Sequence, residues 1–170
     1  MTMHARLFGS VLAIGVLLLL PNPAAAKGST KTQLAGVWKV TSLVVREVET
    51  GATRNTFGEK PVGHAVFTRG GRFLWGWVSD GRKAPAGPVP DDAERGALYN
   101  TLAFGSGSFR VEGDAVFLRY ESSWNQSWTG TERRAEMQVT GKTLVWKSLP
   151  FKPLDGDRDV VAITTLERVE

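Results

Sequence analysis

The sequence predicts an all-β fold, an eight-stranded antiparallel up-and-down barrel with one helix. Three observations support it: runs rich in β-branched and aromatic residues recur along the chain, short glycine-containing turns join most of them, and the first run opens with Gly36-Val37-Trp38. An inward indole at the start of a first strand can fill the closed end of a small barrel, and eight strands can close around one small ligand. The alternative is a sandwich of two stacked sheets, in which Trp38 is an ordinary buried side chain.

The N-terminal segment 1–26 has the pattern of a secretory signal peptide. Arg6 precedes the apolar run 7–20, and alanines at 24–26 supply an Ala-x-Ala cleavage site. We therefore expect cleavage after this segment and a single domain over 27–170. An uncleaved membrane anchor is the alternative, although the apolar run is shorter than the roughly 20 residues that a span needs.

Composition narrows the classes of function. The chain carries 21 Lys and Arg against 17 Asp and Glu, without a run of basic residues. We therefore expect a solvated surface, no nucleic-acid partner and no stable membrane anchor after cleavage. The absence of cysteine excludes a disulfide, a thiolate nucleophile and a lipid attached through cysteine. The expected location is a bacterial periplasm or the extracellular medium.

Eight strands account for most of the domain. In the first of them side chains alternate, so the even-numbered residues from Trp38 to Val44 are expected to face inward, and Leu43 and Val45 outward. The expected strands are 36–47, 64–68, 72–78, 108–112, 115–122, 131–139, 143–149 and 160–169.

A loop and a helix interrupt the strands. Residues 79–90 are rich in glycine and proline and form a long loop of the kind that is usually functional or mobile. Asp91 and Glu94 have capping-box spacing, so we expect a helix from position 91 or 92 to about Ala103. Its apolar face would cover the outward residues of the first strand or lie across a barrel mouth.

Alternation on the strands also indicates what lines the interior. Phe73, Trp75 and Trp77 share one face of their strand, and Arg133 and Met137 share the mostly apolar face of another. The expected cavity wall consists of Phe73, Trp75, Trp77, Tyr120, Arg133 and Met137. The alternative is that the same residues fill a solid core, because an eight-stranded barrel is near the size at which either is possible.

The segment 122–130 contains two indoles, Trp124 and Trp128, among amide and hydroxyl groups. At a barrel mouth these side chains would bind a flat or amphipathic ligand, the indoles through contact area and the polar groups through orientation. At the closed end they would plug the barrel. The sequence leaves both positions open.

Several short motifs, taken in order, resemble the lipocalin-like domain found in many exported proteins, a relative of the true lipocalins. The resemblance covers residues 34–169 and rests on Gly36-Val37-Trp38, Phe57-Gly58-x-x-Pro61-Val62-Gly63, Thr68-x-x-Gly71-Arg72, Ser123-x-Asn125-x-x-Trp128-x-Gly130-Thr131, Gly141-Lys142-Thr143-Leu144 and Leu166-Glu167-Arg168-Val169.

This resemblance implies a barrel with a generic binding capacity. It also implies that Arg168 lies over the face of Trp38 and closes the barrel base, a cation–π contact that contributes about 0.5 to 2 kcal/mol. The chain departs from the pattern at Leu118 and Arg119, where relatives tend to carry histidine, and at 126–127, where they tend to carry proline. A histidine-dependent role is therefore not expected.

Catalytic and metal-binding groups are scarce. His64 is the one histidine outside the signal segment, which excludes a cluster of histidines as a metal site. We interpret it as a surface or rim residue, with axial ligation of a haem as the alternative. Glu121, Glu132 and Glu136 are the nearest candidate acids or bases, and alternation places them outward in surface ion pairs.

The leading hypothesis is an exported, non-catalytic barrel that binds a small hydrophobic or amphipathic molecule, without a cofactor or metal. Its expected ligand residues are Phe73, Trp75, Trp77, Tyr120, Trp124, Trp128, Arg133 and Met137. One alternative is an isomerase, cyclase or hydrolase on the same barrel, which would need an inward carboxylate or histidine. Another is a structural or interaction module of the cell envelope.

Overall fold

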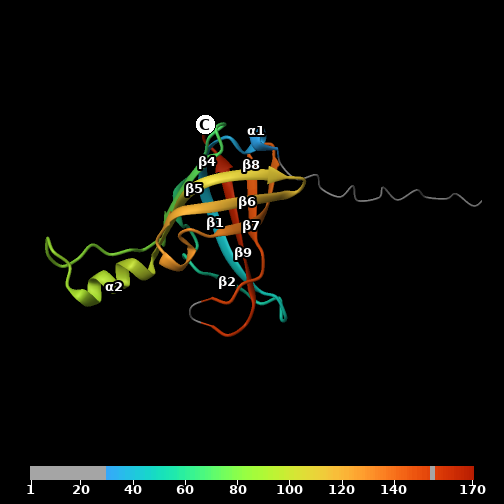
Figure 1. The fold of residues 1–170 in the computed structure, drawn as a ribbon. Helices are drawn as coiled ribbons and strands as arrows, with labels where there is room; N and C mark the ends of the chain where they lie inside the picture. Colours follow the sequence, from blue (N-terminus) through green and yellow to red (C-terminus); the bar gives the residue numbers. More distant parts are fainter. Residues whose placement is uncertain (1–29, 154–155) are drawn as a thin grey trace, which may run out of the picture.

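A computed structural model describes residues 30–153 and 156–170, and its main feature is a closed antiparallel barrel (Figure 1). The predicted signal peptide lies outside the described residues. The strands are β1 (Gly36–Glu47), β2 (Thr53–Asn55), β3 (Val62–Phe67), β4 (Arg72–Val78), β5 (Leu102–Glu112), β6 (Ala115–Ser123), β7 (Glu132–Thr140), β8 (Thr143–Ser148) and β9 (Val160–Arg168). The helices are α1 (Lys31–Leu34), α2 (Asp92–Asn100) and the 3-10 turn η1 (Gln126–Trp128).

The ring of strands confirms the predicted architecture. Each strand from β3 to β8 pairs with the strand that follows it, β1 pairs with β3, and β1 also pairs with β9, which closes an eight-stranded up-and-down barrel. The short strand β2 pairs only with the end of β1 and lies outside the ring. The two stacked sheets of the alternative are therefore excluded.

One end of the barrel, which we call the closed end, is sealed by Trp38. Its indole is fully buried and donates a hydrogen bond from Nε1 to the Leu34 carbonyl at 2.8 Å, which ties the short helix α1 across the base. The Arg168 guanidinium lies 4.0 Å from the centre of the indole ring and donates to the Ala35 carbonyl at 2.7 Å. The predicted contact of Arg168 with Trp38 is confirmed. Gly36 makes room for it, because a Cβ there would stand 2.3 Å from the guanidinium.

The prediction of which β1 side chains face inward is correct up to Val40 and wrong after it. Trp38 and Val40 are buried as expected, but Leu43 and Val45 are also buried, whereas Ser42 and Val44 are not. The cause is a register shift against β9 between Val40 and Ser42, in which one extra residue bulges from the strand. A β-bulge of this kind reverses the side-chain alternation that follows it.

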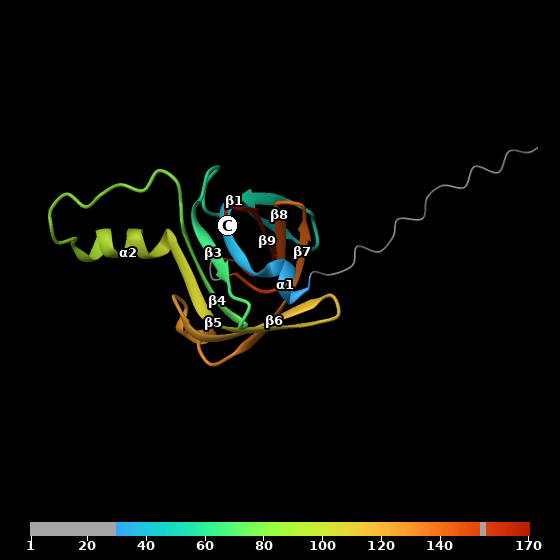
Figure 2. The same ribbon diagram turned by 90° about the horizontal axis from the view of Figure 1, so that it is seen from above.

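The predicted helix exists, but it ends earlier than expected and does not cover the first strand. α2 begins with the predicted capping box of Asp91 and Glu94 and stops at Thr101, whose hydroxyl donates to carbonyls of the last turn. The chain then enters β5, six residues before the predicted strand, because Leu102 and the residues after it pair with β4. Figures 1 and 2 show α2 standing away from the barrel, and none of its residues is buried. Among the described residues, no helix is long and apolar enough to cross a membrane.

The end opposite Trp38, which we call the open end, gathers the longer connections. Because β1 runs from the closed end and its neighbours alternate in direction, the segments 48–61, 79–101 and 124–131 and the described residues 149–153 and 156–159 all lie at the open end. The short hairpin turns after β3, β5 and β7 lie at the closed end. The topology thus decides a question that the sequence left open, since it places Trp124 and Trp128 at the mouth.

Candidate functional site

Five of the eight predicted ligand residues lie deep in the barrel: Phe73, Trp75, Trp77, Tyr120 and Met137, each at most 6 % exposed. The four rings contact one another. Trp75 stacks on Trp77 with a centroid distance of 4.3 Å, and Tyr120 lies edge-on to Phe73 at 5.2 Å and to Trp75 at 6.4 Å. The rings therefore form a packed aromatic floor.

Small residues on β5 allow the rings to approach the barrel wall. A Cβ on Gly105 would stand 2.5 Å from the Tyr120 ring and 3.1 Å from Trp75 Cε2. Any larger side chain at this position would push both rings toward the barrel axis. The close packing of these two rings therefore requires glycine at this position of β5.

Tyr120 links the aromatic floor to the open end. Its hydroxyl oxygen accepts a hydrogen bond from Trp75 Nε1 at 3.3 Å, and its ring lies 5.5 Å from that of Trp128. Burial raises the pKa of the Tyr120 hydroxyl to about 12, against partial compensation from the Trp75 hydrogen bond and the Arg133 charge. The group is therefore a neutral hydrogen-bonding residue at neutral pH.

We expect this pKa to be visible in an alkaline titration. Subtracting the phenolate absorbance of a Tyr120→Phe variant from that of the native protein should leave a single step near pH 12. Because the folded state keeps a proton that the unfolded chain loses near pH 10, stability should fall between about pH 10 and 12. A difference step near pH 10 in the folded protein would contradict the buried placement of the hydroxyl.

The other three predicted ligand residues, Trp124, Trp128 and Arg133, are half-buried at the open end, and we call them the rim cluster. The η1 turn holds the indoles in place, since Asn125 Oδ1 accepts from the Ser127 backbone N–H at 3.1 Å. The two indoles lie edge-on at 6.2 Å, and the Arg133 guanidinium lies 4.4 Å from the centre of the Trp128 ring. The rim cluster therefore rests directly on the aromatic floor.

Two aromatic residues belong to this constellation that the sequence analysis missed. Trp146 on β8 lies 6.0 Å from both Trp75 and Trp77, and pairs with Met137 across β7 and β8. Leu144 and Trp146 are two residues apart on β8, so the alternation of side chains could have predicted that Trp146 faces inward with Leu144. Tyr99 of α2 lies 5.7 Å from Trp124 and donates from its hydroxyl to the Trp124 carbonyl at 2.6 Å. No sequence pattern indicated that contact.

Comparison with known families supplies the identification. The profile of the lipocalin-like domain matches residues 35–169, nearly all of the barrel and its connections. The chain belongs to the lipocalin-like domain family. A comparison with curated proteins returned no match.

One motif of this lipocalin-like barrel braces the open end. Gly58 has a left-handed φ of 77°, and a Cβ there would stand 1.8 Å from Asp80 Oδ1. The other carboxylate oxygen of Asp80 accepts from the Lys60 backbone N–H at 2.8 Å, and the Asp80 N–H donates to the Phe57 carbonyl at 3.2 Å. The turn that precedes β3 is thus tied to the segment that leads to α2.

The candidate acid–base residues are outside the barrel, as predicted. Glu121, Glu132 and Glu136 form exposed ion pairs with Arg72, Arg110 and Lys147, respectively, rather than with Arg119 and Arg134 beside them in sequence. His64 is exposed on β3, which confirms its interpretation as a surface residue.

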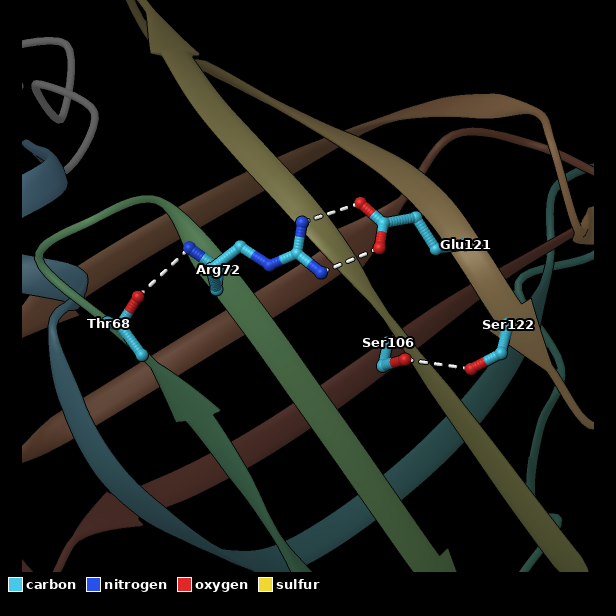
Figure 3. A network of polar contacts seen from close by, with 5 residues as sticks. All are labelled: Thr68, Arg72, Ser106, Glu121 and Ser122. Atoms are coloured by element: carbon cyan, nitrogen blue, oxygen red, sulfur yellow. Dashed lines mark hydrogen bonds and ion pairs between the residues drawn. The ribbon is translucent and has the colours of Figure 1, made fainter.

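The ion pair of Arg72 and Glu121 is drawn in Figure 3. The guanidinium extends from β4 across β5 and makes two parallel 2.6 Å hydrogen bonds with the carboxylate on β6. Ser106 of β5 bonds to Ser122 at 2.8 Å beside it, and the Arg72 backbone N–H donates to Thr68 Oγ1 at 3.0 Å. These contacts brace the outer wall of three neighbouring strands.

We expect this brace to have a small, acid-sensitive effect on stability. The Arg72 guanidinium lowers the pKa of the Glu121 carboxyl through its hydrogen bonds, so its contribution is present at neutral pH and lost as pH falls through the lowered value. Glu121→Gln should lower the Tm slightly at pH 7, with the difference vanishing in acid. A Tm gap that widens below the ordinary pKa of about 4.3 would contradict this sign.

Two hollows on the outer surface contain none of the eight predicted ligand residues. One, of about 460 Å³, lies beside the end of β1 and includes Arg46, Val48 and Leu149. The other, of about 500 Å³, lies between the segment 80–86 and α2. Both are lined mainly by exposed residues, so neither extends the constellation of the floor and rim.

Proposed function

We propose that this lipocalin-like barrel binds a small hydrophobic or amphipathic molecule at its open end. The observation that carries the proposal is the rim cluster, in which two half-buried indoles and an arginine sit on an aromatic floor, opposite a base sealed by Trp38. Half-buried indoles at a barrel mouth offer a large apolar area to a ligand.

The binding free energy would come mainly from apolar contact. Each Å² of ligand surface removed from water contributes ~25 cal/mol, and the exposed faces of Trp124 and Trp128 are the surfaces available for it. The floor of Trp75, Trp77 and Trp146 limits how far the ligand descends, because these rings already contact one another. Arg133 or Tyr120 would orient a polar end.

We expect the protein to bind members of a panel of fatty acids, fatty alcohols and polyketides, with a shift in tryptophan emission and a heat signal in calorimetry. Trp128→Ala should weaken binding about tenfold or more, because Trp128 contacts both Tyr120 and Arg133.

Phe104→Ala is the matched control for that variant. It removes an aromatic ring that points outward from β5 and is 38 % exposed, so binding should stay within about twofold of the native protein. Absence of binding across the panel, or equal weakening by both variants, would contradict the proposal. Mass spectrometry of protein purified from its host then identifies a retained ligand.

We also propose that the protein is exported to a periplasm or secreted, with residues 1–26 removed, and that it has neither a nucleic-acid partner nor a stable membrane anchor. The basic, apolar and Ala-x-Ala pattern of that segment and the absence of cysteine support this proposal. The N-terminal residue of protein recovered from the native host should be Lys27. A product that retains the segment in the membrane fraction would contradict it.

A further inference from the structure

The barrel contains two half-buried arginines in its described residues, Arg133 at the open end and Arg168 at the closed end. Both lie over an indole ring, at 4.4 Å and 4.0 Å from its centre. Arg168 also donates hydrogen bonds to the carbonyls of Gln33 and Ala35, so its N–H groups are used by the fold. Arg133 has no carboxylate or carbonyl partner within the described part of the chain. Both ends of the barrel therefore have an arginine stacked on an indole, but only the arginine at the closed end has hydrogen-bond acceptors among the described residues.

Two further polar groups, on the segment 124–129 that carries the rim indoles, also lack partners among the described residues. The Trp124 Nε1 atom is buried and has no hydrogen-bond partner in the described residues, and the buried Thr129 hydroxyl has none either. The Tyr120 hydroxyl accepts from Trp75 Nε1, which leaves its own proton for another acceptor. A buried donor without an acceptor costs free energy, so a group that supplies oxygen atoms here is favoured.

The carboxylate nearest to Arg133 in sequence, that of Glu132, does not form an ion pair with it. Glu132 points to the outer wall and pairs with Arg110 there. A cationic group is disfavoured at the rim, because the guanidinium already covers the face of Trp128 that a cation would use. The rim cluster thus combines an apolar surface with donors that have no acceptor in the described part of the chain.

We propose that the open end selects amphipathic molecules with a carboxylate head group, and that Arg133 binds this carboxylate with the Trp124 indole N–H beside it. The inference rests on the proposed function and specifies its ligand class. Its physical basis is that a charge-assisted hydrogen bond is about twice as strong as one between neutral groups. The apolar tail of the ligand then lies on the indoles.

Calorimetric titration with three probes of equal chain length tests this inference: dodecanoate, dodecanol and dodecyltrimethylammonium, each below its micellar concentration. Dodecanoate should bind the native protein about tenfold tighter than dodecanol, and the ammonium probe should bind weakest. Arg133→Gln should remove the preference for dodecanoate, so that the variant binds dodecanoate and dodecanol with affinities within about twofold of each other. Trp124→Phe should reduce the preference in part.

Arg134→Gln is the matched control, since Arg134 is the next residue on β7 and is exposed on the outer wall. It removes the same charge from the chain and should leave the preference unchanged. Equal binding of dodecanoate and dodecanol would overturn this inference and leave the proposed function standing. Loss of preference in both arginine variants would also overturn it, because the effect would then be one of net charge. If none of the probes binds, the proposed function falls together with the inference.

Discussion

Replacing Trp38 by alanine is expected to lower the free energy of unfolding by about 3 to 5 kcal/mol, the range for deleting a large aromatic side chain from a core. The indole is fully buried, donates to Leu34 and carries the Arg168 guanidinium on its face. Its removal leaves a cavity at the base and exposes the guanidinium to a void. Denaturant unfolding of the native protein and the variant measures the loss.

Trp38→Phe separates packing from hydrogen bonding at the same position. It keeps a ring under Arg168 but loses the bond to the Leu34 carbonyl, so it should fall between the native protein and the alanine variant. A loss below about 1 kcal/mol for alanine would mean that the base does not hold the barrel closed. Trp38→Ala should also lower the affinity for a ligand only through stability, since the base is at the opposite end from the rim cluster.

Gly63→Ala is expected to destabilise the barrel by about 2 to 6 kcal/mol, from backbone strain and overpacking together. Gly63 has a φ of 154°, and a Cβ on it would stand 2.1 Å from the Gly76 carbonyl oxygen and 2.6 Å from Trp77 Cα. Because these atoms belong to the β4 backbone, they cannot rotate away. The displacement should also move Trp77, so tryptophan emission of the folded variant should change.

Gly96→Ala provides the control for that substitution. Gly96 lies within α2, and a Cβ there would meet nothing within 4 Å. Alanine is the better helix former, so this variant should be more stable by about 0.5 to 1 kcal/mol, or unchanged if α2 unfolds separately from the barrel. Equal losses in the two variants would mean that close approach of β3 to β4 is not what requires glycine at position 63.

Sequence patterns predicted side-chain direction well where strands are regular. On β4 the alternation of Phe73, Trp75 and Trp77 holds, and all three are buried. On β1 it failed after Val40, because a bulge adds one residue and no composition signal marks the position. The alternation of side chains along a strand therefore predicts which residues face inward only up to the first β-bulge.

The start of β5 was missed for a different reason. The strand was expected only from position 108, yet β5 begins at Leu102, and Gly105 and Gly107 are buried within it. Gly105 makes room for the rings of Trp75 and Tyr120, which come from β4 and β6, and Gly107 makes room for the β6 backbone at Arg119. Local propensity is therefore overridden by contacts that only the tertiary fold supplies.

Most residues of the candidate site were predicted, but their division into a buried aromatic floor and a half-buried rim cluster was not. Alternation placed the deep aromatic residues inward, and the indoles of 122–130 were recognised as unusual. Whether those indoles lie at the mouth or the base depends on the direction of each strand in the ring, which alternation does not determine. That Arg133 has no acceptor among the described residues could not be predicted from the sequence, because Glu132 is adjacent in sequence and yet faces the other side of the wall.

The seam between β1 and β9 has a kinetic consequence. It joins residues near the two ends of the domain, and the Arg168 bond to the Ala35 carbonyl spans 133 positions of the chain. Bringing such distant segments together costs loop-closure entropy before any contact compensates for it, and proteins of high contact order fold slowly. Until the last strand docks, β1 presents an unpaired edge, so the nascent chain should be most prone to aggregation just before the ring closes.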